Sequence, residues 1–505
     1  MATERHLKYE IAPDSHATFV NHTGECIGTG RMGLALRKEY LDQLAFTQQE
    51  IGFSHIRGHG LFSDDMGIYQ PYTDADGVQH ERYCFTYLDQ VMDSYLRLGL
   101  KPFLELGFMP YAMASGTQTI FYWRANVTPP ADMEKWTDMV KATLRHLAER
   151  YGEQEVSGWP CEVWNEPNLT IFWENRDKEK YLALYQATSM AVKEVLPRMK
   201  VGGPAICGGS DSLDWVRDFL TFCRDQHLPL DFVTRHAYMG QTPEQKGRYL
   251  YHEMRTVDDI ISEMECTRAV IDSFPEYKGL PMHITEFNTS YHPFCPIHDT
   301  NLNAAYLAGL LSRLGNVAES YSYWTFGDVF EESGVPSLPF HGGFGLVANG
   351  LIPKPTFWTF AFFRALSGDA VLRNEHIILL KKENGGYEGI AWNLCQKSRE
   401  PVCLTLDIPF DGQATLLKQT VDEDCCNPLK CWHEMGEPAS LSKTQLAFLR
   451  MAAQPKCETV VLQAKAGKLT VSLSFSENAV MHFELVPYEK QGDDGYDYEW
   501  YQSHT

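Results

Sequence analysis

Two glutamates at the ends of short apolar runs are the residues of this sequence with the clearest capacity for catalysis. Glu166 ends the run Cys161–Asn165, Glu286 ends the run Met282–Thr285, and an asparagine follows each within two residues. Cleavage of a glycosidic bond needs one protonated carboxyl group, to release the leaving-group oxygen, and one ionised carboxylate, to attack or to activate water. The pair therefore predicts an enzyme that cleaves glycosides.

The neighbours of Glu166 favour this interpretation. A single strand-end glutamate more often belongs to a structural ion pair. Here Trp164, Asn165 and Asn168 surround it, and a second glutamate ends another strand-like run, which favours catalysis. Pro167 is expected to hold Glu166 extended, because the residue before a proline is sterically restricted. Asn165 is a suitable donor to a sugar 2-hydroxyl group.

The elements that would position these glutamates alternate regularly between residues 25 and 330. Eight short apolar runs, each followed by room for a helix, predict an α/β fold, a (β/α)8 TIM barrel over residues 20–355. Glu166 and Glu286 would end the fourth and seventh strands, so both would lie on the C-terminal face, where barrel active sites form. The expected strands are Cys26–Gly30, His55–Gly60, Pro102–Gly107, Cys161–Glu166, Val201–Ile206, Phe232–Tyr238, Met282–Phe287 and Tyr321–Phe326.

The segment Tyr87–Leu98 is representative of the expected helices, because its apolar residues recur at helical spacing. Thr86, with Asp89 three residues later, is expected to cap its start, and Gly99 to end it.

The pattern changes beyond residue 365. Apolar residues alternate strictly with Thr or Ser over Leu469–Ser476, as in a half-buried strand. Asn384-Gly385-Gly386 separates two apolar runs, which indicates a hairpin. We expect an accessory antiparallel β-sandwich over residues 365–487, which the family resemblance given below extends to residues 1–19. Residues 488–505 form an acidic, aromatic tail, expected to be free or to dock on a neighbouring subunit as an oligomerisation arm.

Other residues at expected strand ends could contact a sugar. His59, His236 and Tyr238 could bind its hydroxyl groups, although a lone histidine is more often a structural one. Trp324 could form an apolar floor, although tryptophan is more often a core residue. Glu331 and Glu332 lie just beyond Trp324 and could reach distal hydroxyl groups.

The composition indicates which binding partners and which cellular compartment to expect. The formal net charge of −22, without a Lys/Arg run, argues against nucleic acid and anionic membranes. No secretory signal or membrane-spanning apolar stretch is visible. Thirteen cysteines lack the spacing of a disulfide framework or zinc site. We therefore expect a cytoplasmic protein with no metal and no cofactor.

Several motifs together resemble glycoside hydrolase family 39, and within it the bacterial β-xylosidases. They include Gly28–Arg31, Phe121–Trp123, Gly202–Gly209, Arg235–Tyr238, Tyr323–Glu332 and His341–Gly345, besides the two glutamate runs. The resemblance implies a retaining exo-β-xylosidase acting on xylo-oligosaccharides, and a homotetramer. It implies Glu166 as acid/base and Glu286 as nucleophile, with a xylose subsite lined by His59, Asn165, His236, Tyr238, Trp324, Glu331 and Glu332.

Two alternatives stay open from the sequence. The same mechanism could act on another glycoside, for example a β-glucoside or an α-L-arabinoside. A barrel that binds carbohydrate without cleaving it is the alternative of a different class, but binding alone would not need two catalytic glutamates.

Overall fold

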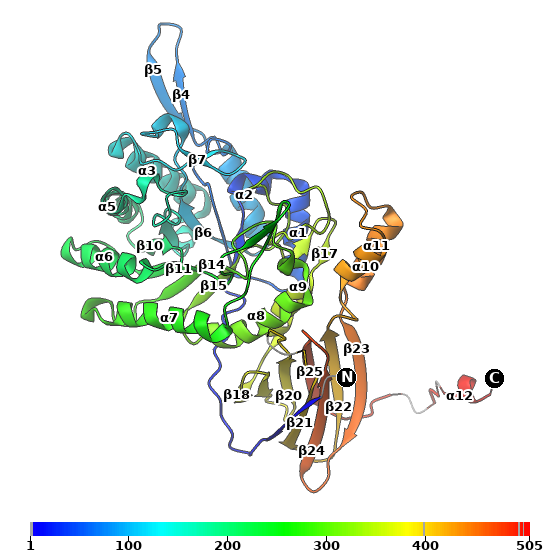
Figure 1. Ribbon diagram of the computed structural model, residues 1–505. Helices are drawn as coiled ribbons and strands as arrows, with labels where there is room; N and C mark the ends of the chain where they lie inside the picture. Colours follow the sequence, from blue (N-terminus) through cyan, green and yellow to red (C-terminus); the bar gives the residue numbers. More distant parts are fainter. Residues whose placement is uncertain (1–3, 397–398, 493–494, 498, 505) are drawn as a thin grey trace.

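The computed structural model describes residues 4–396, 399–492, 495–497 and 499–504. Figure 1 shows a barrel surrounded by helices and, beneath it, a smaller unit of two sheets. The predicted (β/α)8 barrel with an accessory β-sandwich is confirmed. Residues 1–3, 397 and 398 of the expected sandwich and residues 493, 494, 498 and 505 of the expected tail lie outside the described residues.

All eight expected barrel strands form, and neighbouring strands pair in parallel. Several of them are buried along their whole length, as in β10, because the barrel interior covers one face and helices cover the other. The strands are β2 (Cys26–Thr29), β3 (His55–Gly58), β6 (Lys101–Leu106), β9 (Cys161–Val163), β10 (Val201–Ile206), β11 (Phe232–Tyr238), β14 (Met282–Asn288) and β15 (Ser320–Tyr323).

The helices around the barrel begin and end at recognisable signals. In α3 the Asp132 side chain accepts from two backbone N–H groups, and Gly152 follows the last turn at φ 92°. In α7 the Thr256 and Asp259 side chains form a capping box. The helices are α1 (Lys38–Glu50), α2 (Thr86–Arg97), α3 (Met133–Tyr151), α4 (Glu153–Val156), α5 (Lys178–Val195), α6 (Ser212–Asp225), α7 (Val257–Asp272), α8 (Asn301–Leu314) and α9 (Pro355–Ala365).

The expected cap of α2 is wrong. Thr86 is the first helical residue, the N-cap position is Phe85, and neither end of a capping box forms. The Asp89 carboxylate instead lies 2.6 Å from His146 Nε2 of α3, so a contact between helices replaces the local cap.

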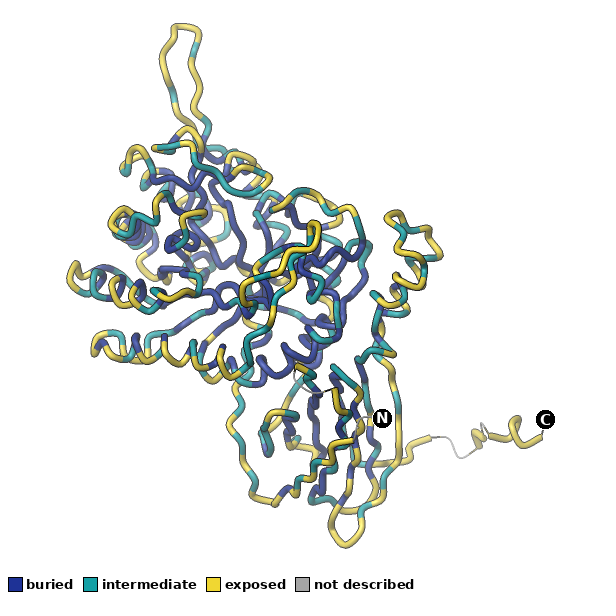
Figure 2. The backbone as a smooth tube through the Cα atoms, in the orientation of Figure 1, coloured by how far each residue is buried: buried dark blue, intermediate teal, exposed yellow. Residues whose placement is uncertain are grey.

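Short strand pairs and 3-10 helices lie in the connections between the main strands and helices. The hairpin β4–β5 projects from it and is largely exposed (Figures 1 and 2). The short strand pairs are β4 (Tyr69–Thr73) with β5 (Gln79–Tyr83), β7 (Thr119–Ile120) with β8 (Ala125–Asn126), β12 (Glu244–Lys246) with β13 (Tyr249–Tyr251), and β16 (Val347–Ala348) with β17 (Ile352–Pro353). The 3-10 helices are η1 (Met32–Leu36), η2 (Tyr111–Met113), η3 (Glu174–Arg176), η4 (Pro275–Tyr277) and η5 (Pro296–Asp299).

The sandwich has its own core, which includes Leu404, Leu473 and Phe483. Its pairs are antiparallel, including the expected hairpin of β19 and β20, except that β1 pairs in parallel with β21. Parallel pairing is possible there because no tight turn joins these two strands, which are far apart in sequence. One sheet contains β1 (Arg5–Glu10), β21 (Val402–Pro409) and β24 (Lys468–Phe475), and the other β18 (Asp369–Arg373), β19 (Ile377–Lys381), β20 (Tyr387–Trp392), β25 (Val480–Pro487), β22 (Gln413–Val421) and β23 (Lys456–Gln463).

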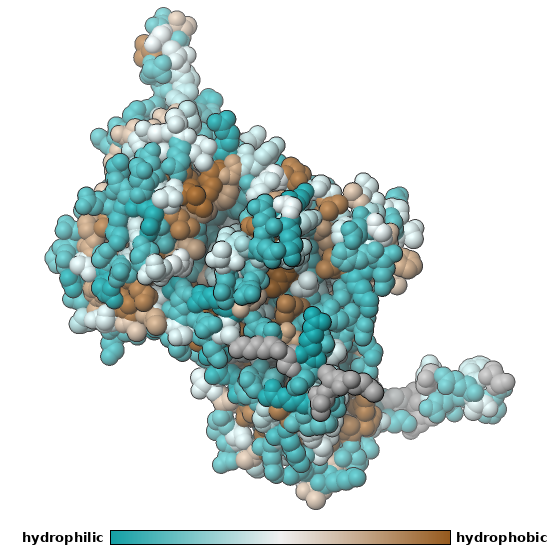
Figure 3. All heavy atoms as spheres, viewed as in Figure 1, coloured by the Kyte–Doolittle hydropathy of each residue, from teal (hydrophilic) through white to brown (hydrophobic). Residues whose placement is uncertain are grey.

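Helices α10 (Pro428–Glu434) and α11 (Lys443–Ala452) lie between β22 and β23 in the sequence, and α12 (Trp500–Ser503) is in the C-terminal tail. The face seen in Figure 3 is mainly hydrophilic, with apolar residues in small groups. None of the helices among the described residues is both long and apolar enough to cross a membrane.

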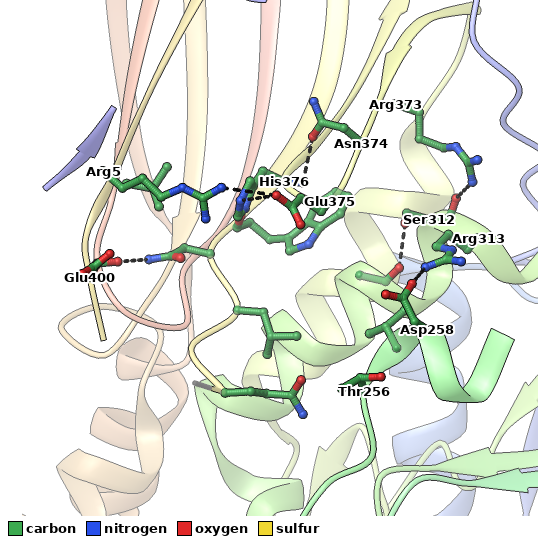
Figure 4. Close-up of a pocket in the computed structure, with 17 residues that line it drawn as sticks. Arg5, Thr256, Asp258, Ser312, Arg313, Arg373, Asn374, Glu375, His376 and Glu400 are labelled. Carbon is green, nitrogen blue, oxygen red and sulfur yellow. Dashed lines mark hydrogen bonds and ion pairs between the residues drawn. The ribbon is translucent and has the colours of Figure 1, made fainter. Parts of the chain in front are cut away.

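A cavity of about 590 Å³ lies where the barrel meets the sandwich. In Figure 4, Arg313 faces Asp258, with which it forms an ion pair, and Arg5 pairs with Glu375 across 3.3 Å. None of the expected site residues lines this cavity. The candidate site is elsewhere, on the C-terminal face of the barrel.

Candidate active site

The carboxyl ends of the barrel strands bring most of the expected site residues together. A pocket of about 390 Å³ there is lined by Glu166, Glu286 and other expected site residues. Glu286 lies within β14, whereas Glu166 follows the end of β9 by three residues. The remaining expected residues that line the pocket are His59, Tyr238, Trp324 and Glu332.

Glu166 reaches the pocket through a sharp backbone turn, and the expected extended conformation is wrong. Its φ is 44°, and Trp164 also has a positive φ of 70°. Positive φ in residues other than glycine costs of order 1–3 kcal/mol and is concentrated at functional sites. The turn lets the Glu166 backbone N–H donate to the Ala205 carbonyl group at the end of β10, at 3.0 Å.

The two carboxyl groups lie close together. One oxygen of Glu166, one of Glu286 and a ring nitrogen of His236 all lie within 4.8 Å of one another. His236 Nδ1 is 2.6 Å from Glu166 Oε1, and Tyr238 donates to Glu286 Oε2 at 2.5 Å. Retaining glycosidases hold their carboxyl groups about 5–5.5 Å apart, whereas inverting ones hold them about 6.5–9.5 Å apart. The spacing favours the retaining class.

A fully buried arginine connects this pair to two further glutamates. Arg57 Nη1 donates to Glu286 at 2.5 Å, and Arg57 Nη2 lies 2.7 Å from Glu162 and 2.9 Å from Glu105. Arg57 also donates to Asn165 Oδ1 at 2.8 Å. Burial lowers the pKa of Arg57, but the three carboxylates outweigh it and hold that pKa above its ordinary value.

Glu166 differs from Glu286 in having no arginine partner. Burial, with the negative charge of Glu286 as the next cause, raises the pKa of Glu166 well above its ordinary value. Burial also lowers the pKa of His236 well below its ordinary value, with Arg57 acting in the same direction. The two shifts favour the neutral form of His236 and the protonated form of Glu166.

Glu332 and Glu331 point to different surroundings. Glu332 lines the pocket, where burial and the charges of Glu286 and Glu166 raise its pKa well above the ordinary value. Glu331, like Asn165 and His236, is not among the residues that line the pocket, and its expected role in the subsite stays a prediction. Its carboxylate lies 2.7 Å from both Arg31 Nη2 and Arg37 Nη1, which compensate a buried negative charge.

Aromatic rings form the apolar part of the pocket. The Trp324 ring lies 4.6 Å from the His59 ring, between centroids, and 6.0 Å from the Phe330 ring. Phe121, Phe172, Tyr291 and Phe344 also line the pocket. Such a lining suits the apolar face of a sugar ring, as expected for Trp324.

Two buried polar atoms beside the carboxylates have no hydrogen-bond partner among the described residues: Asn165 Nδ2 and His236 Nε2. Buried polar groups normally have partners. Asn165 and His236 contact the carboxyl network through their other polar atoms, and neither residue is among those that line the pocket.

Sequence reasoning missed Arg57, Glu105 and Glu162, although the expected strand His55–Gly60 contains Arg57. The missed signal was a charged residue inside a short apolar strand. Arg57 and His59 are two positions apart, so along a strand they face the same side. Glu162 stands likewise between Cys161 and Val163, and Glu105 between two leucines.

The cluster of Glu166, His236 and Glu286 is also the one group of described residues whose side chains converge as metal ligands could. The arrangement is already accounted for by hydrogen bonds, because His236 Nδ1 is engaged with Glu166 and Glu286 accepts from Arg57 and Tyr238. The adjacent Arg57 supplies the positive charge that a cation would bring.

Comparisons with known proteins agree with this geometry. A model of the glycosyl hydrolases family 39 matches residues 8–470. A β-xylosidase of Geobacillus stearothermophilus is 47% identical over 466 residues, which are 91% of this chain and 92% of that protein.

Solved structures extend the similarity to three dimensions. The crystal structure of a family 39 enzyme of Xanthomonas axonopodis pv. citri has a TM-score of 0.86 at 30% identity, covering 97% of this chain and 98% of its own. A β-xylosidase of Caulobacter crescentus, described as monomeric, has a TM-score of 0.86 at 32% identity, covering 96% of this chain and 100% of its own.

The charge of Glu286 contributes to the raised pKa of Glu166, so removal of that charge should lower this pKa. In Glu286→Gln that charge is lost while Arg57 remains, so the pKa of Glu166 should fall by about one unit or more. Titration of a chain with ¹³C-labelled glutamate, followed by NMR, measures it, with Glu166→Gln to assign the resonance. Glu153→Gln, an exposed carboxylate, should leave this titration unchanged; an unmoved or raised pKa in Glu286→Gln would contradict the coupling.

Proposed function

The chain belongs to the glycosyl hydrolases family 39, and on this premise we propose that it is a retaining, exo-acting β-xylosidase. It would release xylose from the non-reducing ends of xylo-oligosaccharides. The observation that carries the proposal is the approach of Glu166 and Glu286 within 4.8 Å. Only the retaining mechanism uses carboxyl groups so close together.

In the first half of the reaction, Glu286 acts as nucleophile. One of its oxygens forms a bond to the anomeric carbon while the bond from that carbon to the glycosidic oxygen breaks. The proton of Glu166 passes to the departing oxygen, so Glu166 becomes ionised. The hydrogen bonds from Arg57 and Tyr238 support Glu286 in this role, because both donors stabilise a carboxylate and fix its direction.

In the second half, Glu166 acts as base. It takes a proton from water, the water oxygen bonds to the anomeric carbon, and the ester bond to Glu286 breaks. Xylose leaves with the β-configuration, and both glutamates return to their starting states. The free Asn165 Nδ2 is suited to bind the sugar 2-hydroxyl group, whose hydrogen bonds strengthen in the transition state.

The size and lining of the pocket support xylose as the sugar. A volume of about 390 Å³ is near the lower end of small-molecule sites, which favours one terminal residue over a long chain. Xylose lacks the hydroxymethyl group that glucose carries on C5. Trp324, Phe330 and Phe344 form a packed aromatic cluster that would close the space beside C5. The Geobacillus relative is a β-xylosidase.

Compartment and assembly are further parts of the proposal. We propose a cytoplasmic location, supported by thirteen free cysteines, since disulfides form mainly in oxidising compartments. A homotetramer is supported by exposed aromatic residues near the C-terminus, Tyr496 and Trp500, which could dock on another copy. The Caulobacter relative is described as monomeric, so light scattering after size-exclusion chromatography decides between the two states.

Hydrolysis of aryl glycosides by the purified chain tests the activity and the sugar together. An aryl β-xyloside should be cleaved with a much higher kcat/KM than the matching β-glucoside, because an excluded group discriminates strongly and kcat/KM reports transition-state binding. The first xylose seen by NMR should be the β-anomer. Initial α-xylose would exclude retention, and equal kcat/KM values would keep the mechanism but exclude xylose as the preferred sugar; absence of hydrolysis would favour a binding protein.

Azide separates the roles of the two glutamates. Glu166→Ala should still form the glycosyl-enzyme from a substrate with a good leaving group, but turn over about 10²–10⁴-fold more slowly, because water lacks a base. Azide needs no deprotonation and should restore turnover as β-xylosyl azide. In Glu286→Ala azide should enter the vacated space and give α-xylosyl azide. The same azide anomer from both variants would contradict the assignment.

A further inference from the structure

A buried lysine contacts the loop that contributes Phe344 to the active-site pocket. Lys354 lies directly before α9, and its side chain is fully buried. Its Nζ is 2.7 Å from Asp299 Oδ1 and 2.8 Å from Asp328 Oδ2, and it donates to the Gly343 carbonyl group at 2.8 Å. Asp299 belongs to η5 and Asp328 follows β15. The contacts therefore join the connection after β14 to the long connection between β15 and α9.

The two aspartates hold the same loop on either side of Phe344. Asp299 Oδ2 accepts from the Gly342 N–H at 2.7 Å. Asp328 Oδ1 accepts from the Gly345 N–H, also at 2.7 Å. A Cβ at Gly345 would collide with the Asp328 backbone, so only glycine allows this close approach. Together with the lysine contact, these bonds fix the backbone before and after Phe344.

Phe344 is the residue through which this loop reaches the sugar site. It lines the active-site pocket, whereas the three charged side chains do not. Its ring centroid lies 5.2 Å from that of Phe330 and 5.2 Å from that of His298. Phe330 in turn packs against Trp324, with 6.0 Å between ring centroids. A shift of the loop would therefore move one side of the pocket without moving the catalytic glutamates.

Thermodynamic stability alone does not explain this charged network. Burial of one ammonium group and two carboxylates is costly, and well-packed apolar residues of similar volume are often as stable. Hydrogen bonds to charged groups are directional and strong, so the network favours one arrangement of the loop. Burial lowers the pKa of Lys354, but the two carboxylates outweigh it and hold that pKa above its ordinary value. The lysine therefore stays charged and keeps both partners.

We propose that Lys354 is a positioning residue that sets the sugar specificity, because it and its two aspartate partners fix Phe344 beside C5 of the bound sugar. The inference rests on the proposed function, in which the aromatic cluster excludes the hydroxymethyl group of glucose. A ring with a fixed position excludes this group. A loop that can move would yield to it, so the charged network acts on the choice of sugar and not on the chemistry.

The test compares the wild type with Lys354→Met, which removes the ammonium group and keeps a chain of similar shape. The quantity measured is the preference, defined as kcat/KM for an aryl β-xyloside divided by kcat/KM for the matching β-glucoside. In Lys354→Met the preference should fall by about tenfold or more, which is the scale on which a pocket discriminates one small group. Phe344→Ala, which removes the ring itself, should change the preference in the same direction.

Lys382→Met is the matched control. Lys382 lies in the β19–β20 hairpin of the sandwich and also pairs with two carboxylates, Glu388 at 3.3 Å and Glu484 at 2.6 Å. Its loss should lower Tm and leave the preference at the wild-type value. A merely structural role of Lys354 predicts the same result for Lys354→Met, namely a lower Tm and an equal loss of activity on both sugars.

Asp299→Asn decides the question if Lys354→Met does not fold. The carboxamide oxygen can still accept from the Gly342 N–H, and Lys354 keeps Asp328 as its partner, so this variant should fold. The bond to Gly342 is weakened, because a neutral acceptor binds less strongly than a charged one, and the preference should fall by a few-fold. An unchanged preference in the folded variant, or in Phe344→Ala, would overturn the proposal.

The wild-type chain separates this inference from the function on which it rests. If the wild type does not hydrolyse the aryl β-xyloside, or does not prefer it to the β-glucoside, the proposed function fails. If the wild type prefers the β-xyloside and Lys354→Met keeps the same preference as Lys382→Met, only the role of Lys354 fails.

Discussion

The pairing of one buried arginine with three buried glutamates is the interaction on which the rest of the site depends. Arg57 contacts Glu105, Glu162 and Glu286, and each of these side chains is almost fully buried. Buried carboxylates are tolerated only when opposite charges and hydrogen bonds compensate them. Arg57 suits this task, because its planar guanidinium group carries five N–H donors and remains charged.

The position of Arg57 also gives Glu166 and Glu286 different electrostatic surroundings. It contacts Glu286 directly, whereas the side-chain partner of Glu166 is His236. Burial and the neighbouring charge of Glu286 then favour the protonated form of Glu166. Environments that separate the proton affinities of two carboxyl groups are how such sites assign an acid and a nucleophile. The position of Arg57 beside Glu286 supports the proposed roles of the two glutamates.

The sequence predicts the scaffold well because the barrel depends on patterns that are local. Each of the eight strands is a short apolar run, and the order of strands in a barrel follows the order in the chain. The carboxyl ends of the strands must then lie on one face of the barrel. The topology alone therefore predicts that Glu166, Glu286, His236 and Tyr238 lie on the same face. The hairpin around Gly385 and the alternation in β24 are equally local.

What the sequence could not predict depends on contacts between distant residues. Glu331 and Glu332 are adjacent in a loop without period, and the choice between them is made by Arg31 and Arg37, some 300 residues away. The φ of Glu166, which was expected to be extended, depends on the contact of its N–H with the Ala205 carbonyl group. Thr86 lost its expected cap because Asp89 contacts α3. In each case tertiary contacts override the local signal.

Identification of the residue that bonds to the sugar tests the central assignment most directly. An activated 2-deoxy-2-fluoro-β-xyloside forms the glycosyl-enzyme but slows its breakdown, because fluorine destabilises the oxocarbenium-like transition state. Mass spectrometry of the digested, inactivated protein should find one fluoroxylosyl group, on the peptide that contains Glu286. A label on Glu166 or on any other residue, or inactivation without a covalent label, would contradict the assignment of Glu286 as the nucleophile that Arg57 supports.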